Sequence, residues 1–403
     1  MSAVSGINHK KNRLQNKMLI LKLIASENGI SRVELSKKTG LTKMTISNLI
    51  NSLIEDGLVE EDTETPVNSS GFGRNPIMLR ISSKSPCICG ILIKRGRCQI
   101  ILGDLSGQVF DSEILENFKE INAEKLIEFI KNGFTRLKER NDRRILAIGI
   151  SCIGPVNGET GVILNPPFFH DIKNLPLAQI MKDYTQLPTF LINDGNAGAL
   201  AELMYGSGKG IINFAYIHIM HGIGSGFVLQ GNIYEGDIGQ SGEIGHSTIN
   251  FSGPKCNCGN TGCLELYANI NNVRKYVSNL ALFYPSSPLS KMKEPSLLDV
   301  VDAANQEDFL AVSALEEYLG YVAHAMTSII NFLDLSYIIV DYSSTSSGTV
   351  LEDLLYRKIM SSVYHFSEKD IHIVRSRFKG EAPLIGSLAV VAKKVFENQL
   401  QLQ

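Results

Sequence analysis

The sequence predicts an α/β protein with a small helical domain at its amino terminus. Two observations lead to this prediction. The first segment of the chain reads as short helices separated by glycines. From about Ile81 the texture changes to apolar, strand-like runs separated by helical stretches, which is typical of α/β folds. At 403 residues, the chain is long enough for two or three domains of roughly 150 residues each.

Composition places the chain among globular proteins. Hydrophobic residues make up 44% and charged residues 20% of the sequence, which argues against a disordered, collagen-like or coiled-coil protein. No stretch approaches the roughly 18 to 20 consecutive apolar residues of a membrane helix, and the polar start lacks the apolar core of a signal peptide. We therefore expect a cytoplasmic protein without a membrane partner, in which thiols stay reduced.

The net charge of −2 hides an uneven distribution. Residues 1–50 hold nine Lys or Arg against only Glu27 and Glu34, a balance of +7 that leaves −9 for the remainder. A basic end on an acidic body is typical of a nucleic-acid-binding domain attached to another domain, although basic faces on surface helices are also common.

Two helices are expected first in this basic region. Residues 17–28 are rich in helix formers and end near Gly29, a residue suited to the left-handed turn that closes a helix. Ser31 and Glu34 then have the spacing of a capping box, in which the serine hydroxyl and the glutamate carboxylate satisfy free backbone amides. The second helix therefore starts there and runs only as far as Gly40.

The third helix, with Thr42 as its expected N-cap, has two different faces. Apolar residues at helical spacing must pack inward; these are Ile46, Leu49, Ile50, Leu53 and Ile54. The opposite face offers short donors and acceptors with one cation, as a helix that reads a DNA major groove requires; these are Thr42, Lys43, Thr45 and Asn48. The pattern predicts a helix-turn-helix, with Arg32 as a further candidate DNA contact.

The following residues read as a winged hairpin. Two short strand-like segments between Leu58 and Ile81 flank a loop rich in Gly, Ser and Asn. Arg74 would lie at the tip of this wing, where an arginine can enter a minor groove. We place the DNA-binding domain at residues 1–82. The alternative that the residues leave open is a small helical domain that binds another protein.

The body of the chain predicts mixed sheets. The runs CICGILI and CQIILGDL, separated only by KRGR, read as a hairpin, whereas later apolar runs are spaced widely enough for crossover helices. Helices are expected at about 307–333 and 350–362, and a surface loop at 285–296.

The sharpest local signal is a group of one histidine and three cysteines. His246, Cys256, Cys258 and Cys263 follow the order H-x9-C-x-C-x4-C. Three thiolates and one imidazole close a tetrahedral Zn²⁺ site and leave no position for an activated water, so the zinc would be structural. The alternative is a set of reduced, buried cysteines beside an unrelated histidine.

Polar residues on both sides of this group form a second candidate site. Asn193 and Asp194 end an apolar strand and open a helix, a position that faces the ligand crevice in many α/β folds. Glu243 and Glu265 bracket the metal-ligand candidates, so the metal loop could hold both near one pocket together with His246. Acceptors of this kind suit the vicinal hydroxyls of a sugar, although each residue alone is also a reasonable cap or surface charge.

Together these residues resemble the ROK family of bacterial sugar kinases and sugar-responsive repressors. Residues 30–61 with GFGRNP resemble the winged helix of the repressor branch, which the kinases lack. NDGNAGALAE, GEIGH and CNCGNTGCLE resemble the family's sugar-binding and zinc segments. The resemblance implies a two-lobed, actin-like ATPase fold at residues 83–403, with a smaller lobe at about 83–200 plus the C-terminal helix and a larger lobe at about 201–384.

The resemblance also implies roles for single residues. Sugar hydroxyls would be bound by Asn193, Asp194, Glu243, His246 and Glu265, with Asp194 matching the base of the kinases. The kinases' Asp-x-Gly-Gly-Thr turn aligns with Leu92, Lys94, Arg95 and Gly96, and a later Gly-Gly aligns with Asp341–Tyr342. The elements that would bind nucleotide phosphates are therefore expected to be degenerate.

The sequence thus predicts a sugar-responsive transcriptional repressor of carbohydrate-use genes and not an enzyme. It would bind operator DNA as a homodimer or homotetramer, with structural Zn²⁺ as its cofactor. A sugar that closes the lobes would change the spacing of two recognition helices. The alternatives are an ATP-dependent sugar kinase that carries a DNA-binding domain, and a binding protein that docks a transport or signalling partner.

Overall fold

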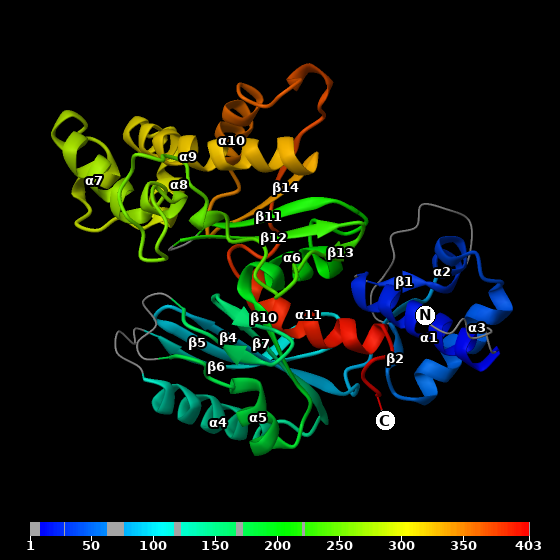
Figure 1. The fold of residues 1–403 in the computed structure, drawn as a ribbon. Coiled ribbons are helices and arrows are strands. Elements are labelled where there is room, and N and C mark those ends of the chain that lie inside the picture. The colour runs from blue at the N-terminus through cyan, green and yellow to red at the C-terminus, as the bar shows by residue number, and fades with distance from the viewer. Residues whose placement is uncertain are drawn as a thin grey trace. The chain divides into compact units, whose positions relative to one another are not determined.

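The chain divides into two compact units (Figure 1). Unit 1 comprises residues 1–150, 176–191 and 387–403, and unit 2 comprises residues 151–175 and 192–386. The computed structural model describes residues 9–27, 29–62, 76–116, 122–166, 172–219 and 222–402. Within these ranges, no helix combines the length and the apolar character that a membrane span requires.

The start of unit 1 is a winged helix. It consists of α1 (His9–Ser26), α2 (Arg32–Thr39) and α3 (Lys43–Glu55) with a small sheet in the order β1–β3–β2. The strands are β1 (Ile30–Ser31), β2 (Val59–Asp62) and β3 (Met78–Ile81). The predicted winged helix-turn-helix is therefore confirmed, although its first helix begins earlier than residue 17. The predicted wing tip, with Arg74, lies outside the described residues.

Local sequence sets the turn between α2 and α3. The Ser31 hydroxyl accepts a hydrogen bond from the Glu34 amide, and the Glu34 carboxylate accepts one from the Ser31 amide, which confirms the capping box. Gly40 closes α2 in the left-handed conformation with φ 71°, and the Thr42 hydroxyl caps α3 by accepting from the Thr45 amide. The inward stripe of α3 is buried, except that Ile54 is only partly covered.

The α/β part of unit 1 is built around a five-stranded sheet in the order β10–β7–β4–β5–β6. Its strands are β4 (Cys87–Lys94), β5 (Arg97–Gly103), β6 (Val109–Glu116), β7 (Ile145–Cys152) and β10 (Thr189–Asn193). The antiparallel pairing of β4 with β5 confirms the predicted hairpin. Helices α4 (Ala123–Glu139) and α5 (Leu177–Thr185) lie on one face and α11 (Ala382–Phe396) on the other (Figure 1).

A second five-stranded sheet, in the order β13–β12–β11–β14–β15, forms the core of unit 2. Its strands are β11 (Phe214–Ile219), β12 (Ile223–Leu229), β13 (Asn232–Ile233), β14 (Tyr337–Asp341) and β15 (His372–Arg375). Strand β11 pairs antiparallel with β12 and parallel with β14, as a mixed sheet with crossover helices requires. A separate hairpin pairs β8 (Val156–Asn157) with β9 (Val162–Ile163).

Helices complete unit 2. They are α6 (Asp194–Tyr205), α7 (Ile270–Leu280), α8 (Leu297–Ala304), α9 (Phe309–Leu333) and α10 (Val350–Met360). The helices predicted at about 307–333 and 350–362 are confirmed. The loop expected at 285–296 instead contains a short 3₁₀ helix, η4 (Pro288–Lys291), because Leu289 turns inward and is fully buried in the core.

Candidate functional site

The first turn of α6 carries two of the predicted pocket residues. Strand β10 ends at Asn193, whose side-chain oxygen caps the helix by accepting from the amides of Gly195 at 2.8 Å and Asn196 at 3.3 Å. Asp194 is the first residue of the helix, where the helix dipole favours a negative charge. The local sequence therefore fixes an amide and a carboxylate at one helix end.

Close backbone packing brings α6 against β12 and against the loop that follows β13. A Cβ atom on Gly195 would lie 2.1 Å from the carbonyl oxygen of Ser225, and one on Gly242 would lie 2.3 Å from the same oxygen. Only residues without a side chain allow such an approach. The contact places Asp194, next to Gly195, and Glu243, next to Gly242, on adjoining segments.

The loop after β7 lies against two of these polar residues. A Cβ atom on Gly154 would lie 2.7 Å from the Asn193 side-chain nitrogen and 2.7 Å from Oε1 of Glu243. Gly154 therefore sits directly against both polar groups. The peptide bond between Gly154 and Pro155 is cis.

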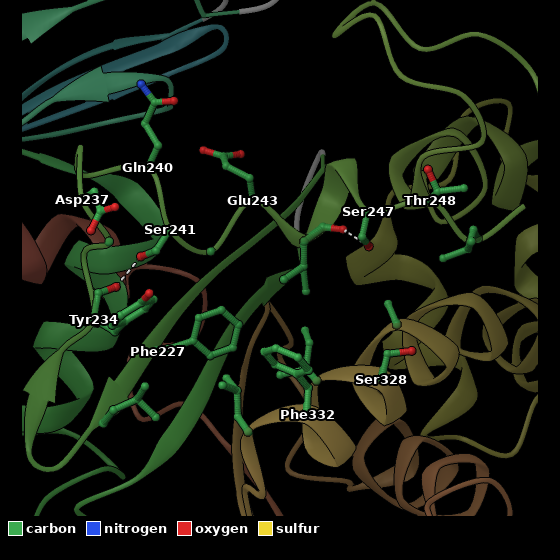
Figure 2. A pocket seen from close by; sticks show the side chains of 18 of the residues that line it. Phe227, Tyr234, Asp237, Gln240, Ser241, Glu243, Ser247, Thr248, Ser328 and Phe332 are labelled. Carbon is green, nitrogen blue, oxygen red and sulfur yellow. Dashed lines mark hydrogen bonds between the residues drawn. The ribbon is translucent and has the colours of Figure 1, made fainter. Parts of the chain in front are cut away.

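Three carboxylates interact in this pocket. Desolvation by the surrounding protein, with the negative charges of Asp194 and Glu265, raises the pKa of Glu243 to about 7, although the residue is exposed to solvent. At neutral pH Glu243 can thus donate as well as accept a hydrogen bond. Glu243 also lies at the edge of an apolar groove in unit 2 (Figure 2).

The four predicted metal ligands come together. Their donor atoms, from His246, Cys256, Cys258 and Cys263, all lie within 4.8 Å of one another. The sulfurs of Cys258 and Cys263 are 3.7 Å apart, and the Cys256 sulfur is 3.8 Å from Nδ1 of His246. Ligands at about 2.3 Å from a tetrahedral zinc would be about 3.8 Å apart, so the cluster could hold a metal ion of this kind.

The His-Cys₃ group also contacts Glu265, another of the predicted sugar-binding residues. His246 ends η1 (Ile244–His246) and Glu265 lies in η2 (Leu264–Leu266), and Nδ1 of His246 is 3.5 Å from Oε1 of Glu265. The Cys256 thiol is also 3.5 Å from this carboxylate oxygen. Contacts and shared charge thus link Asn193, Asp194, Glu243, His246 and Glu265 in one region of unit 2.

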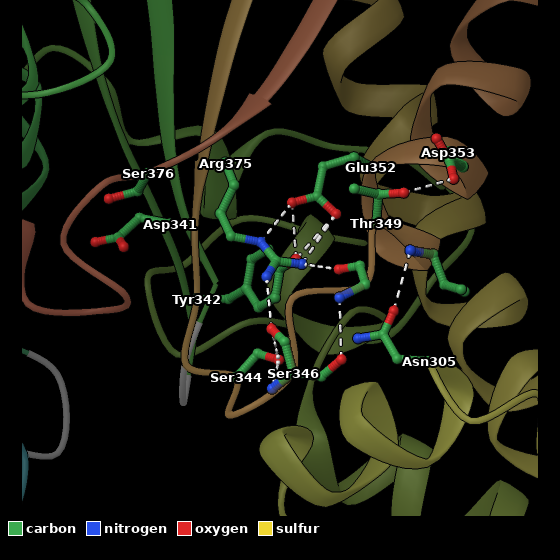
Figure 3. Close-up of polar contacts among 12 residues, drawn as sticks. Asn305, Asp341, Tyr342, Ser344, Ser346, Thr349, Glu352, Asp353, Arg375 and Ser376 are labelled. Carbon is green, nitrogen blue, oxygen red and sulfur yellow. Dashed lines mark hydrogen bonds and ion pairs between the residues drawn. The ribbon is translucent and has the colours of Figure 1, made fainter.

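A second polar centre was not predicted, and it surrounds Tyr342 (Figure 3). The Arg375 guanidinium donates to both oxygens of Glu352, at 2.8 and 3.3 Å, and to the carbonyl oxygens of Ser346 and Gly348. It also lies 4.7 Å from the centre of the Tyr342 ring, and the Tyr342 hydroxyl donates to Glu352. Sequence reasoning missed this network because Arg375, which joins its members, comes from a different strand, β15.

Asp341, just before Tyr342, is also fully enclosed. It accepts hydrogen bonds from the Tyr216 hydroxyl at 2.7 Å and from the Gly380 amide at 2.5 Å. Burial opposes ionisation, but the hydrogen bonds from His218, Tyr216 and Gly380 and the charge of His218 outweigh it and hold the pKa of Asp341 below its usual value.

The recognition face of α3 has the expected exposure. Thr42, Lys43 and Asn48 are exposed and Thr45 is half-buried. Met44, which the sequence reasoning overlooked because it is apolar, is 76% exposed on the same helix. The Arg32 guanidinium instead forms an ion pair with Glu61 at 2.8 Å.

These features define a winged-helix protein whose α/β body carries a polar pocket beside a His-Cys₃ cluster. Residues 88–394 match the family model described as "ROK family", and residues 13–60 match "Winged helix-turn-helix DNA-binding". The chain belongs to the ROK family.

Named relatives agree with this assignment. The chain is 31% identical over 379 residues to the xylose repressor of Bacillus spizizenii, covering 93% of this chain and 94% of that protein. It is 26% identical over 313 residues to the glucokinase of Thermotoga maritima, covering 74% of this chain and 99% of that enzyme. A crystal structure of a ROK family transcriptional regulator, a homologue of the Escherichia coli Mlc protein, superposes with a TM-score of 0.74 at 28% identity, covering 96% and 97% of the two chains.

Glu202, within α6, makes the stability of unit 2 depend on pH. Its side chain is fully buried and one of its oxygens has no hydrogen-bond partner among the described residues. Burial raises the pKa of Glu202 to about 7, above its usual value, despite hydrogen bonds from Ser376 and Ser207. Because the folded pKa is the higher one, this group stabilises the fold at low pH, and that contribution is lost as the pH rises through 7.

We predict that Glu202→Gln removes this dependence. Between pH 8 and pH 6, the free energy of unfolding of the wild type should rise by about 1.4 kcal/mol more than that of the variant. Urea unfolding of both proteins at pH 6, 7 and 8 measures this difference in unfolding free energy. The other titrating groups contribute equally to both proteins and therefore cancel. Parallel curves for the two proteins would contradict the assignment.

Proposed function

We propose that this chain is a sugar-responsive, DNA-binding transcriptional repressor of carbohydrate-use genes. The observation that carries the proposal is the presence, in one chain, of a winged helix and of a ROK domain whose polar pocket residues converge. A xylose repressor that matches 93% of the chain supports it. The glucokinase match, by contrast, covers only 74% of this chain.

For the DNA-binding half, we propose that α3 enters the major groove of an operator. Thr42, Thr45 and Asn48 would contact base edges, and Lys43 would contact a phosphate. Arg74 on the wing would enter the minor groove. Arg32 would add only a phosphate contact, since Glu61 already holds its guanidinium.

For the effector half, we propose that a monosaccharide binds at the end of α6. Asn193, Asp194, Glu243, His246 and Glu265 would hold its hydroxyls. Carboxylates bind hydroxyl donors more strongly than neutral acceptors do, and three carboxylates that share one pocket suit a ligand with several hydroxyls. The relatives named as xylose repressors favour a pentose such as xylose as the first sugar to test.

We infer that the chain is not a sugar kinase. Phosphoryl transfer needs open backbone amides around the nucleotide phosphates. The position that aligns with a Gly-Gly of the kinases holds Asp341 and the buried Tyr342, which is enclosed by Arg375 and Glu352. Side chains that fill this region support a degenerate nucleotide site. The retained Asp194 would then serve as a hydrogen-bond acceptor only.

We propose that the metal cluster holds structural Zn²⁺. Three thiolates and one imidazole match its preferred ligands and leave no coordination position free for a water. When bound, the ion would fix His246 and, through it, Glu265 at the edge of the pocket. Metal occupancy and the response to sugar would therefore be coupled.

We further propose a homodimer or homotetramer, with the DNA-binding domain at residues 1–82 and the ROK domain at residues 83–403. The smaller lobe would comprise about 83–200 plus the C-terminal helix, and the larger lobe about 201–384. Sugar-driven closure of the lobes would change the distance between two recognition helices, which must match half-sites about 34 to 36 Å apart.

The proposed function predicts release of operator DNA by a sugar without turnover of ATP. With a labelled promoter fragment, xylose at 100 times its dissociation constant should weaken DNA binding and raise the stability of the protein by about 2.7 kcal/mol. Glucose and N-acetylglucosamine serve as comparison sugars in the same two assays. Magnesium-dependent ATP consumption that requires a sugar would favour the kinase, whereas DNA binding indifferent to every sugar would favour a partner-docking protein.

Substitutions in α3 should separate affinity from sequence preference. Asn48→Ala or Thr45→Ala should relax base preference at one operator position by about 1 to 3 kcal/mol, whereas Arg74→Ala should weaken binding to all sequences and reduce its salt dependence. Binding titrations on single-base operator variants at two salt concentrations measure both effects. If all three variants bind like the wild type, the proposed DNA contacts are wrong.

Loss of one cysteine ligand should abolish metal binding and the sugar response together. Cys258→Ser should reduce the zinc content from about one ion per chain to almost none, because three remaining ligands hold the ion weakly. Cys89→Ala, in β4 and far along the chain from the cluster, is the matched control and should keep its zinc. Zinc analysis and operator release by sugar are the measurements, and normal release by a zinc-free variant would refute the coupling.

A further inference from the structure

Met44 is an apolar side chain at the start of α3 that the protein leaves uncovered. It is 76% exposed, the highest value among the large hydrophobic residues that the structure describes in the winged helix. It is also the second residue of α3 after the Thr42 cap. The N-terminal residues of a recognition helix are the ones that contact base edges in helix-turn-helix proteins. Met44 therefore lies where α3 would come closest to the bases in a major groove.

The neighbouring polar side chains are partly engaged within the protein. The Thr42 hydroxyl accepts a hydrogen bond from the Thr45 amide at 3.3 Å and lies 3.0 Å from the Thr45 hydroxyl. These contacts form the cap and keep both threonine side chains at the end of the helix. Met44 and Asn48, four residues apart, are exposed on one face of α3. This face thus presents one apolar and one amide side chain.

The charge around Met44 indicates that the partner is a polyanion. Residues 35–54 contain three lysines and no Asp or Glu. Lys38 pairs with Glu27 at 2.6 Å, whereas Lys37 and Lys43 form no ion pair among the residues that the structure describes. DNA supplies the phosphates that such lysines bind and also presents one apolar group in its major groove, the 5-methyl group of thymine. An exposed methionine among unpaired lysines matches this combination.

We propose that Met44 determines part of the sequence preference of α3 by covering the 5-methyl group of a thymine in the operator. The inference rests on the proposed function and deepens it, because it names a base that each half-site must contain. Asn48 lies four residues further along the same face, and four residues of a helix rise about 6 Å, less than two base-pair steps of about 3.4 Å. The thymine should therefore lie within about two base pairs of the base that Asn48 contacts.

The test removes the methyl group from the DNA and the side chain from the protein, separately and together. The full-length wild type first selects a duplex from a random DNA pool, and each thymine of that duplex is then replaced by deoxyuridine, which lacks only the 5-methyl group. In each half-site, one replacement should weaken wild-type binding about four-fold, because an apolar contact of about one methyl group is lost. Met44→Ala should bind the unmodified duplex at least about four-fold more weakly than the wild type, and the same replacement should cause it no further loss.

Met44→Leu and Leu19→Ala are the control variants. Leucine keeps an apolar side chain at this position, so Met44→Leu should retain the penalty for deoxyuridine. Leu19 is a 42% exposed apolar residue of α1, and Leu19→Ala should respond to every replacement as the wild type does. Circular dichroism shows that each variant is folded, and binding titrations at one salt concentration measure all four proteins.

Two results would overturn the proposal. One is that no replacement of a thymine weakens wild-type binding, and the other is that Met44→Ala retains the full penalty at every sensitive thymine. The proposed function fails separately. A wild type that selects no DNA sequence would overturn the repressor assignment together with the role of Met44, whereas a wild type that selects a duplex but is indifferent to every methyl group removes only the role of Met44.

Discussion

The polar site of unit 2 depends on one backbone contact, the convergence of two segments on the carbonyl oxygen of Ser225 in β12. Gly195 in α6 and Gly242 in the loop after β13 both approach this oxygen more closely than any residue with a Cβ atom could, and Gly226 of β12 approaches the Gly195 carbonyl in the same way. Because each glycine is next to or near a polar pocket residue, the contact fixes where Asp194 and Glu243 lie. A larger residue at any of the three positions would separate the segments, and the carboxylates would then no longer share a pocket.

The features that the sequence predicted well depend on residues that lie close together along the chain. The capping box at Ser31 and Glu34, the Thr42 cap and the inward stripe of α3 all lie within a few residues of one another, so spacing alone indicates them. The His-Cys₃ cluster is similar, because three of its ligands fall within eight residues. By contrast, the pairing of Arg375 with Glu352 joins β15 to α10, and the burial of Leu289 depends on helices that precede and follow it. Such contacts can be identified only from the three-dimensional arrangement of the helices and strands.

The two polar centres of unit 2 differ in a way that bears on the proposed loss of kinase activity. Around Tyr342, the ion pair between the half-buried Arg375 and the buried Glu352 has its hydrogen-bonding groups engaged by neighbouring residues. Removal of Arg375 would leave the buried Glu352 carboxylate without its countercharge, so the network resists opening. At the end of α6, the pKa of Glu243 is raised by desolvation and by repulsion from the neighbouring carboxylates. The first centre is internally satisfied, whereas the second gains from any ligand that donates hydrogen bonds to it.

The loop from Tyr234 to Ile249 is the element through which these parts can influence one another. It contributes Glu243 to the pocket and His246 to the metal cluster, and it forms a wall of the apolar groove. A ligand changes an equilibrium only through its preference for one state, and a shift from 1:99 to 99:1 needs about 5.5 kcal/mol of preference. A few charge-assisted hydrogen bonds, at about 1.5 to 3 kcal/mol each, supply that amount if they form in one loop position only. The proposed zinc, by fixing His246 of this loop, would limit the positions that the loop can take and so make the response to a sugar discrete and not gradual.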